Sequence, residues 1–152
     1  MSTLGIDPGS KQSGIVIWTP ATHYLVMAEK EINNEKLLEF CRQLRSDVKI
    51  NLVAIECIRG YGIVAGNDTF ITAEWVGRFM EACYPKPVKL ITRKEVKLTL
   101  CGTTTTNDKY IRQALIDRYG EVGTKKAKGP LFEITGHCWA ALSVAIVAGE
   151  LK

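Results

Sequence analysis

Two acidic residues, Asp7 and Glu56, occupy positions from which a protein can hold a divalent cation. Asp7 follows a short apolar stretch and precedes a Pro-Gly-Ser turn, so we expect its carboxylate to leave the end of a strand with a rigid backbone behind it. Glu56 interrupts an apolar run near its end, where a charge is costly to bury unless it is paired or coordinated. A turn-capping Asp7 and a merely solvated Glu56 are the ordinary alternatives.

The elements around these residues are expected to make them neighbours. Three short apolar stretches separated by turn residues indicate an antiparallel meander of strands: residues 3–7, 14–18 and 24–28. A helix capped by Asn33 or Asn34 follows. Residues 51–57 then form a nearly continuous apolar run, which is typical of a central parallel strand. The strands that end in Asp7 and Glu56 would lie side by side in this topology.

The rest of the chain alternates between helical and strand patterns. A helix is predicted over residues 69–83, with a buried face made of Phe70, Ala73, Val76 or Gly77, and Met80. The later elements are a strand at 88–91, helices at 94–100 and 109–119, a basic loop at 120–130, and a last helix at 137–151. This order predicts an α/β fold in which the meander and a parallel β-α-β part share one mixed sheet.

Composition sets the class of protein. The 152 residues are 46% hydrophobic, which suits one compact domain over residues 1–152. No apolar run approaches the ~20 residues that span a bilayer, and no leader-like segment opens the chain, so we expect a cytoplasmic protein without membrane contact. The five cysteines are scattered through apolar segments without a C-x-x-C pair, which predicts reduced core residues.

Positive charge is concentrated in the second half of the chain. The formal net charge of +4 is only mildly basic, and solubility explains it about as well as nucleic-acid binding does. The interval 93–128, however, holds nine cationic side chains: Arg93, Lys94, Lys97, Lys109, Arg112, Arg118, Lys125, Lys126 and Lys128. This clustering favours a phosphate-backbone partner.

Five segments in order resemble the RuvC family of Holliday junction resolvases over nearly the whole chain, and especially its short phage branch. They are LGIDPGSKQSGIVIW, the strand LVAIE, the helix WVGRFMEA, VKLTLCG followed by NDKYIRQALIDRYG, and the terminal GHCWAALSVAIVAG. No single one of these motifs is decisive, but their order makes the resemblance strong.

The resemblance implies a ribonuclease H-like fold, with a mixed five-stranded sheet flanked by helices, in a homodimer that acts on four-way junctions and related branched DNA. It implies a metal-dependent endonuclease of DNA recombination and repair, in the cytoplasm of a bacterial host if a phage encodes it. Two Mg²⁺ or Mn²⁺ ions would be held at each active site by acidic residues of the first strand, the fourth strand and the last helix. Asp7 and Glu56 match the first two positions, and His137 stands at the start of the last helix.

The last helix departs from the family pattern. In the family an acid or a histidine is followed three residues later by an aspartate, which places both on one helical face. Here the pair is His137 and Ala140, and alanine cannot coordinate a metal. Three explanations are open: an engineered inactive protein, a natural variant with another ligand or a single tight metal, and a wrong alignment of this helix. Taken alone, His137 would be a polar or capping residue at a helix start.

Several further residues are candidates for contact with DNA. Lys97 and Lys109 match two lysines that the family places near its active site, although each alone could be a solvated helix lysine. Tyr61, in a Gly-rich stretch, is a better candidate than Phe70 for a wedge against unstacked bases. Asp108 could replace the missing acid, but its place at a helix start also suits a cap. The predicted DNA-contacting set is Tyr61, Lys97, Lys109, Arg112, Lys125 and Lys126.

The second helix is the predicted dimer interface, because Trp75, Phe79 and Met80 make it richer in large apolar residues than one core face requires. Two rival functions are considered. One is a non-catalytic junction-binding protein that lost its metal affinity at Ala140, which a cleavage assay beside an Ala140→Asp variant would detect. The other is an actin-like ATPase fragment, since the Asp-Pro-Gly hairpin resembles a phosphate-binding turn; calorimetry with nucleotide would test it.

Overall fold

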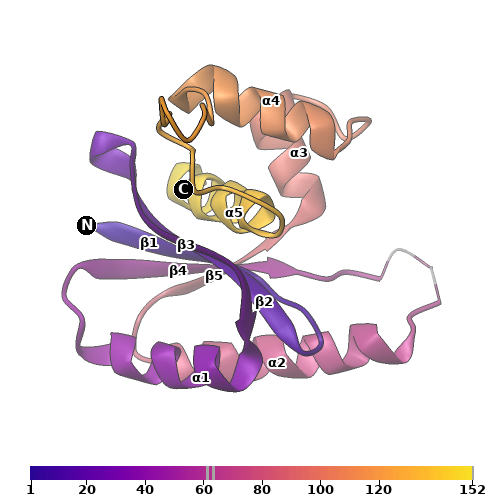
Figure 1. Ribbon diagram of the computed structural model, residues 1–152. Coiled ribbons are helices and arrows are strands. Elements are labelled where there is room, and N and C mark those ends of the chain that lie inside the picture. The colour runs from indigo at the N-terminus through magenta and orange to yellow at the C-terminus, as the bar shows by residue number, and fades with distance from the viewer. Residues whose placement is uncertain (61, 63, 152) are drawn as a thin grey trace.

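The predicted strands form one five-stranded mixed sheet in the computed structural model, which describes residues 1–60, 62 and 64–151 (Figure 1). The sheet has the strand order β3-β2-β1-β4-β5, with antiparallel pairs β1/β2 and β2/β3 and parallel pairs β1/β4 and β4/β5. The strands are β1 (Ser2–Asp7), β2 (Gln12–Thr19), β3 (Tyr24–Asn33), β4 (Ile50–Cys57) and β5 (Val88–Thr92). The sequence-based fold class is therefore confirmed.

Helices cover both faces of this sheet. Figure 1 shows α1 and α2 packed beneath it and α5 directly above it, with α3 and α4 on the α5 side. The α-helices are α1 (Asn34–Gln43), α2 (Asn67–Cys83), α3 (Arg93–Cys101), α4 (Asp108–Tyr119) and α5 (Cys138–Glu150). Two short 3-10 turns, Pro20–Thr22 and Leu44–Ser46, follow β2 and α1.

Side chains alternate between the two faces of each strand, as the strand repeat requires. Leu4 and Ile6 of β1 belong to the apolar cluster shared with α1 and α2. Gly5, between them, faces α5, since a Cβ built on it would lie 2.0 Å from the carbonyl oxygen of Ala141. Asp7 follows at the next position of the same period and is therefore directed to the α5 side. The Asp7 side chain, at the end of β1, therefore lies on the face of the sheet that α5 covers.

The buried face predicted for α2 was right at Val76 and wrong at its other positions. The buried residues of this helix include Thr72, Val76, Phe79 and Cys83, whereas the side chain of Phe70 is 60% exposed. The helix carries large apolar residues on more than one side, so its sequence is compatible with two different buried faces. Packing against the rest of the chain buries the face that contains Phe79 and not the one that contains Phe70. Phe79 is fully buried, so it belongs to the core of its own chain and not to the predicted interface with a partner.

β3 is the strand whose boundary differs most from the one expected. β3 continues to Asn33, five residues beyond the predicted end, because its polar second half pairs with β2 at the edge of the sheet. The Asn33 side chain then caps α1 by accepting hydrogen bonds from the backbone N–H groups of Glu35 and Lys36. All five cysteines are free thiols, as the sequence predicted, but only Cys41, Cys83 and Cys138 are the buried core residues expected, since Cys57 and Cys101 are partly exposed.

Helix α5 is held at both ends. Near its start, an added Cβ on Gly14 would lie 2.6 Å from the Cβ of His137, so the helix rests directly on β2. At its end, the Lys89 Nζ of β5 donates hydrogen bonds to the carbonyl oxygens of Ala148 and Leu151, at 2.9 and 2.5 Å. A cation at this place also suits the negative end of the helix dipole.

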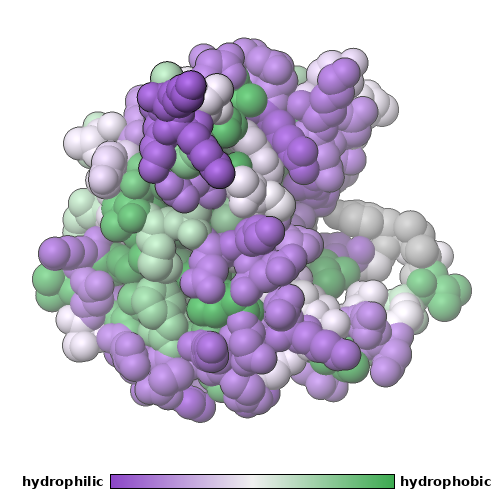
Figure 2. All heavy atoms as spheres, viewed as in Figure 1, coloured by the Kyte–Doolittle hydropathy of each residue, from purple (hydrophilic) through white to green (hydrophobic). Residues whose placement is uncertain are grey.

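Hydrophilic residues cover most of the helical layers on the visible surface, and hydrophobic residues gather between them at the level of the sheet (Figure 2). On α2 the Arg78 guanidinium carbon lies 4.0 Å from the ring centre of Trp75, so this exposed helix face is partly screened by a cation. Within the described residues, we find no helix that is both long and apolar enough to span a membrane.

Candidate functional site

The register of the sheet brings Asp7 and Glu56 together. Ile6 of β1 pairs with Ile55 of the parallel strand β4, so the two carboxylates are the next residues along adjacent strands. Both strands end there, and the carboxyl ends of neighbouring parallel strands are a usual place for a binding site. The convergence expected from the sequence is present.

The turn after Asp7 is fixed by a buried polar network. The Ser13 hydroxyl accepts a hydrogen bond from the backbone N–H of Gly9 and donates one to the Asn34 side-chain oxygen, at 3.3 and 2.7 Å. The Asn34 amide in turn donates to the Gly9 carbonyl oxygen at 2.8 Å. Ser13 and Asn34 are buried, so these bonds are shielded from water and hold the β1–β2 hairpin rigid. The Asp7 carboxylate is therefore positioned before any ligand arrives.

His137 reaches this carboxylate from the other layer. It occupies the N-cap position of α5 but makes no side-chain capping bond, and its ring Nδ1 lies 2.8 Å from the Asp7 Oδ2. The imidazole is mostly exposed, whereas the Asp7 side chain is only 15% exposed. The contact exists because Gly14 has no side chain to hold α5 away from β2. Three predicted ligands, Asp7, Glu56 and His137, thus line one region.

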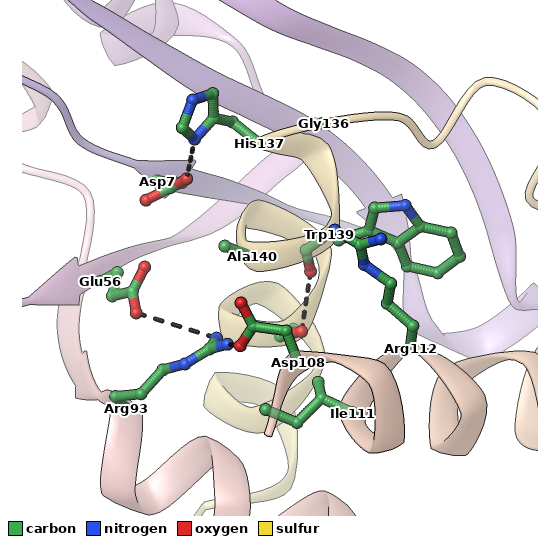
Figure 3. A pocket seen from close by; sticks show the side chains of 11 residues that line it. Asp7, Glu56, Arg93, Asp108, Ile111, Arg112, Gly136, His137, Trp139 and Ala140 are labelled. Atoms are coloured by element: carbon green, nitrogen blue, oxygen red, sulfur yellow. Dashed lines mark hydrogen bonds and ion pairs between the residues drawn. The ribbon is translucent and has the colours of Figure 1, made fainter.

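That region is a cleft of about 490 Å³ (Figure 3). Its lining residues come from β1, β4, α3, α4, α5 and the turn before α5: Asp7, Glu56, Arg93, Asp108, Ile111, Arg112, Gly136, His137, Trp139, Ala140 and Ser143. A second cleft, of about 320 Å³, shares Asp7, Glu56 and Arg93 with the first. These three side chains therefore lie at the boundary between the two clefts.

Glu56 is electrostatically the most perturbed member of the site. Burial in the sheet, and then the negative charge of neighbouring Asp7, raise the pKa of Glu56 to about 7, against the opposing effect of Arg93. Two carboxylates crowded in a partly dry cleft favour the uptake of a proton or of a cation. A divalent ion would relieve the repulsion that the raised pKa reflects.

Arg93 lies between two of the carboxylates. Its guanidinium forms an ion pair with Asp108 and stands 4.0 Å from the Glu56 carboxylate, as Figure 3 shows. Arg93 is placed by the strand register, since Cys57 pairs with Thr92 immediately before it. Asp108 does not cap its helix: the Asn107 side chain accepts the bonds from the backbone N–H groups of Lys109 and Tyr110. The capping explanation for Asp108 therefore does not hold.

Ala140 lies one helical turn after His137 and lines the same cleft. Figure 3 places its methyl group on the side of α5 that faces Asp7. An aspartate at this position would direct its carboxylate into the cleft, which is what the spacing in the sequence predicts.

The two carboxylates fit Mg²⁺ or Mn²⁺, which prefer oxygen ligands, whereas an imidazole nitrogen is a more usual ligand for transition-metal ions. Asp7 and Glu56 supply the oxygens and His137 the nitrogen. The arrangement is nevertheless not closed around an ion: the part of the chain that the structure describes contains no ready-made cluster of three or more histidine, cysteine, aspartate or glutamate ligands. The residues suit a divalent cation by chemistry and by charge, and they would have to draw together to hold it.

The predicted DNA-contacting residues are spread more widely. Arg112 lines the cleft, with its guanidinium carbon 5.7 Å from the ring centre of Trp139. Neither Lys97 on α3 nor Lys109 on α4 is among the described residues that line it. Lys125 and Lys126 are exposed in the loop after α4. Tyr61 lies outside the described residues.

Among the polar and aromatic residues that line the cleft, sequence reasoning missed Arg93 as a partner of the carboxylates, Trp139 and Ser143. Trp139 and Ser143 had a detectable signal, because they lie two and six residues after His137 on a helix that was predicted to line the site. Arg93 had a weaker one, as the first residue after a strand that pairs with β4. Its side-chain direction depends on Asp108, which is distant in sequence.

Comparison with known proteins finds similarity at the level of structure only. No protein-family model and no curated protein matches the chain. The solved structure of Thermus thermophilus RuvC is 18% identical, with 98% of this chain and 93% of that one covered and a TM-score of 0.73. The same organism's RuvC in complex with a Holliday junction substrate is 17% identical, with 98% and 92% covered and a TM-score of 0.72. The yeast mitochondrial Holliday junction resolvase is 11% identical, with 97% and 77% covered and a TM-score of 0.55.

At these identities the similarity establishes the fold. The chain has the ribonuclease H-like α/β fold of RuvC-type Holliday junction resolvases, over nearly its whole length. The resemblance stated from the five sequence segments is confirmed at this level, whereas its phage branch stays a prediction.

Proposed function

We propose that this chain, which has the fold of junction-resolving nucleases, is a structure-selective DNA endonuclease that hydrolyses phosphodiester bonds in four-way junctions and related branched DNA with Mg²⁺ or Mn²⁺. One observation carries the proposal: Asp7, Glu56 and His137, from two strands and a helix, line a single cleft in this fold. Arg112 adds a cation to the same cleft, which suits a phosphate-bearing substrate.

In this proposal Asp7, Glu56 and His137 hold the metal. A bound Mg²⁺ or Mn²⁺ supplies an activated water and offsets charge on the departing oxygen. The 2.8 Å contact between His137 Nδ1 and Asp7 Oδ2 keeps the imidazole turned toward the strand ends. Glu56, whose pKa is raised by burial and by Asp7, would bind the cation as an ionised carboxylate.

DNA contacts are proposed for basic side chains on and around the cleft rim. Arg112 is held beside the Trp139 ring, which leaves its guanidinium facing the cleft. Lys125 and Lys126 extend the positive surface beyond α4, and Lys97, Lys109 and Tyr61 complete the proposed set. Such contacts position the backbone without reading the base sequence.

A homodimer is part of the proposal, because two symmetric nicks across a junction need two active sites related by a two-fold axis. A cytoplasmic location, in a bacterial host if the chain is phage-encoded, is proposed with it, and the work would belong to DNA recombination and repair.

The test is cleavage of a synthetic four-way junction, with linear duplex of the same sequence as the control. We expect nicking of the junction with Mg²⁺ or Mn²⁺ and none with EDTA. Asp7→Asn should keep junction binding in a gel-shift assay and lose nicking. Nicking that survives EDTA, or that does not discriminate between junction and duplex, would contradict the proposal.

A second function is favoured by one observation: the methyl group of Ala140 stands in the cleft where an acid would coordinate. In this alternative the chain binds branched DNA without cutting it. The Ala140→Asp variant separates the two functions. Binding without nicking in the parent, together with nicking in the variant, would favour the binding protein.

A further inference from the structure

The guanidinium of Arg93 stands where a cation is expected. It pairs with Asp108 on one side and lies 4.0 Å from Glu56 on the other, at the boundary shared by the two clefts. Its side chain is 32% exposed, so the charge is partly shielded from water and acts strongly on its neighbours.

Helix α3 itself gives no reason for an arginine here. Arg93 is the first residue of this helix, where the backbone dipole favours an acid and disfavours a cation. The cap is supplied by Thr92 and Glu95, which satisfy each other's backbone N–H groups in a capping box. The position of Arg93 is therefore explained by the carboxylates it faces and not by helix stability.

The charges of the cleft favour one divalent ion over two. Asp7, Glu56 and Asp108 contribute three negative charges when ionised, and Arg93 and Arg112 contribute two positive charges that do not dissociate. The resulting net charge of −1 becomes +1 with one divalent cation and +3 with two. The ligands agree with this count, because Ala140 offers no oxygen to a second ion.

We propose that the site takes up one divalent ion, between Asp7, Glu56 and His137, and that the Arg93 guanidinium permanently occupies the position of a second cation. This inference rests on the proposed metal-dependent function and replaces the two ions expected from the family resemblance. Asp108 holds Arg93 in place and acts as a positioning residue.

The experiment is a Mn²⁺ titration of the full chain, followed by electron paramagnetic resonance, which counts bound ions and detects a spin-coupled pair. We expect one Mn²⁺ per chain and an uncoupled spectrum in the parent. Arg93→Met removes the charge without adding a ligand and frees Glu56 and Asp108, so the count should rise to two, with a coupled spectrum. Arg93→Lys keeps the charge and should stay at one.

Arg112→Met is the matched control, because Arg112 lines the same cleft but stacks beside Trp139. It should bind one Mn²⁺, so that a rise confined to Arg93→Met excludes a general effect of lost positive charge. Two coupled ions in the parent, or one ion in a folded Arg93→Met variant, would overturn the inference and leave the nuclease proposal standing. No Mn²⁺ bound by the parent would instead overturn the metal-dependent function itself. If Arg93→Met does not fold, the number of Mn²⁺ ions bound per chain by the parent and by Arg93→Lys still tests the inference, because two coupled ions in either protein would overturn it.

Discussion

The two faces of the sheet are built on different principles. Toward α1 and α2 the strands present large aliphatic side chains, such as Leu4, Ile6 and Ile55, which fill a conventional apolar layer. Toward α5 the same strands present Gly5 and Ala54, and the helix backbone approaches the sheet closely. Both faces bury an apolar cluster, but only on the α5 face do β1 and β4 give up side-chain volume, so that a helix can deliver His137 to Asp7.

The contrast between the two faces explains where the candidate site lies in this fold. Asp7 and Glu56 follow Gly5 and Ala54 in the two-residue repeat, so both carboxylates point to the face with small residues. Ile6 and Ile55, their neighbours in sequence, are fully buried on the other face. Stability and chemistry should therefore respond separately to substitutions of adjacent residues.

The largest expected effect is that of Asp7→Asn. This change keeps the shape of the side chain but removes the charge that His137 contacts and that the proposed cation would need, so we expect a loss of nicking of roughly a thousandfold, with little loss of stability. Single-turnover cleavage of a junction measures the nicking rate, and urea unfolding measures the stability. Asp117→Asn, an exposed residue of α4, is the control. A large loss of unfolding free energy in Asp7→Asn would contradict the separation of stability and chemistry between the two faces.

The next effect concerns pH. Folding raises the pKa of Glu56 from 4.5 to about 7, so the metal-free native state binds this proton more tightly than the unfolded chain does. The resulting stabilisation is fully present below about pH 4.5 and is lost as the pH rises through 7, which amounts to about 3 kcal/mol at roughly 1.4 kcal/mol per unit. Urea unfolding from pH 4.5 to 8 should show this decline in the parent and a smaller one in Glu56→Gln. Parallel curves would contradict it.

Gly5→Ala tests the close approach of α5. The new methyl group would meet the carbonyl oxygen of Ala141, a backbone atom that cannot rotate away, so we expect a loss of about 2 kcal/mol in unfolding free energy and weaker nicking as His137 shifts. Gly77→Ala on α2 is the matched control, since its Cβ would meet nothing within 4 Å. There a gain of up to about 1 kcal/mol follows from helix propensity. Equal changes in unfolding free energy for Gly5→Ala and Gly77→Ala would contradict the close approach of α5 as the cause.

Ile6→Val gives the smallest effect and the sharpest contrast with Asp7→Asn. It removes one buried methylene-sized group from the α1–α2 face and should cost about 1 kcal/mol of stability. Nicking and Mn²⁺ count at 25 °C should not change. Altered metal binding in this variant would show that the two faces are coupled through the strand.

The sequence predicted the parts of the site that depend on backbone alone. Asp7 and Glu56 could be paired because two apolar stretches end beside them and parallel strands carry their ends to the same edge. His137 and Ala140 could be placed on one helical face from their spacing. These inferences need only a strand order and two periodicities.

The remaining parts depend on side-chain packing between distant elements. The buried stripe of α2 was misassigned because Phe70 and Phe79 are both large and apolar, and only contact with α1 and the sheet distinguishes them. Arg93 was read as part of a basic stretch, since nothing local shows that it turns toward Asp108. The role of Arg93 becomes visible only when β1, β4, α3 and α4 are placed together in the structure.

The Lys89 contacts at the end of α5 limit how the length of the chain can vary. Because the carbonyl oxygens of Ala148 and Leu151 are tied to β5, one residue inserted in the middle of α5 would rotate everything before it by about 100° and lengthen the helix by about 1.5 Å. His137 would then turn away from Asp7. The same insertion before Gly136 would be absorbed by the connecting loop, so natural variation in length is expected on that side of the helix start alone.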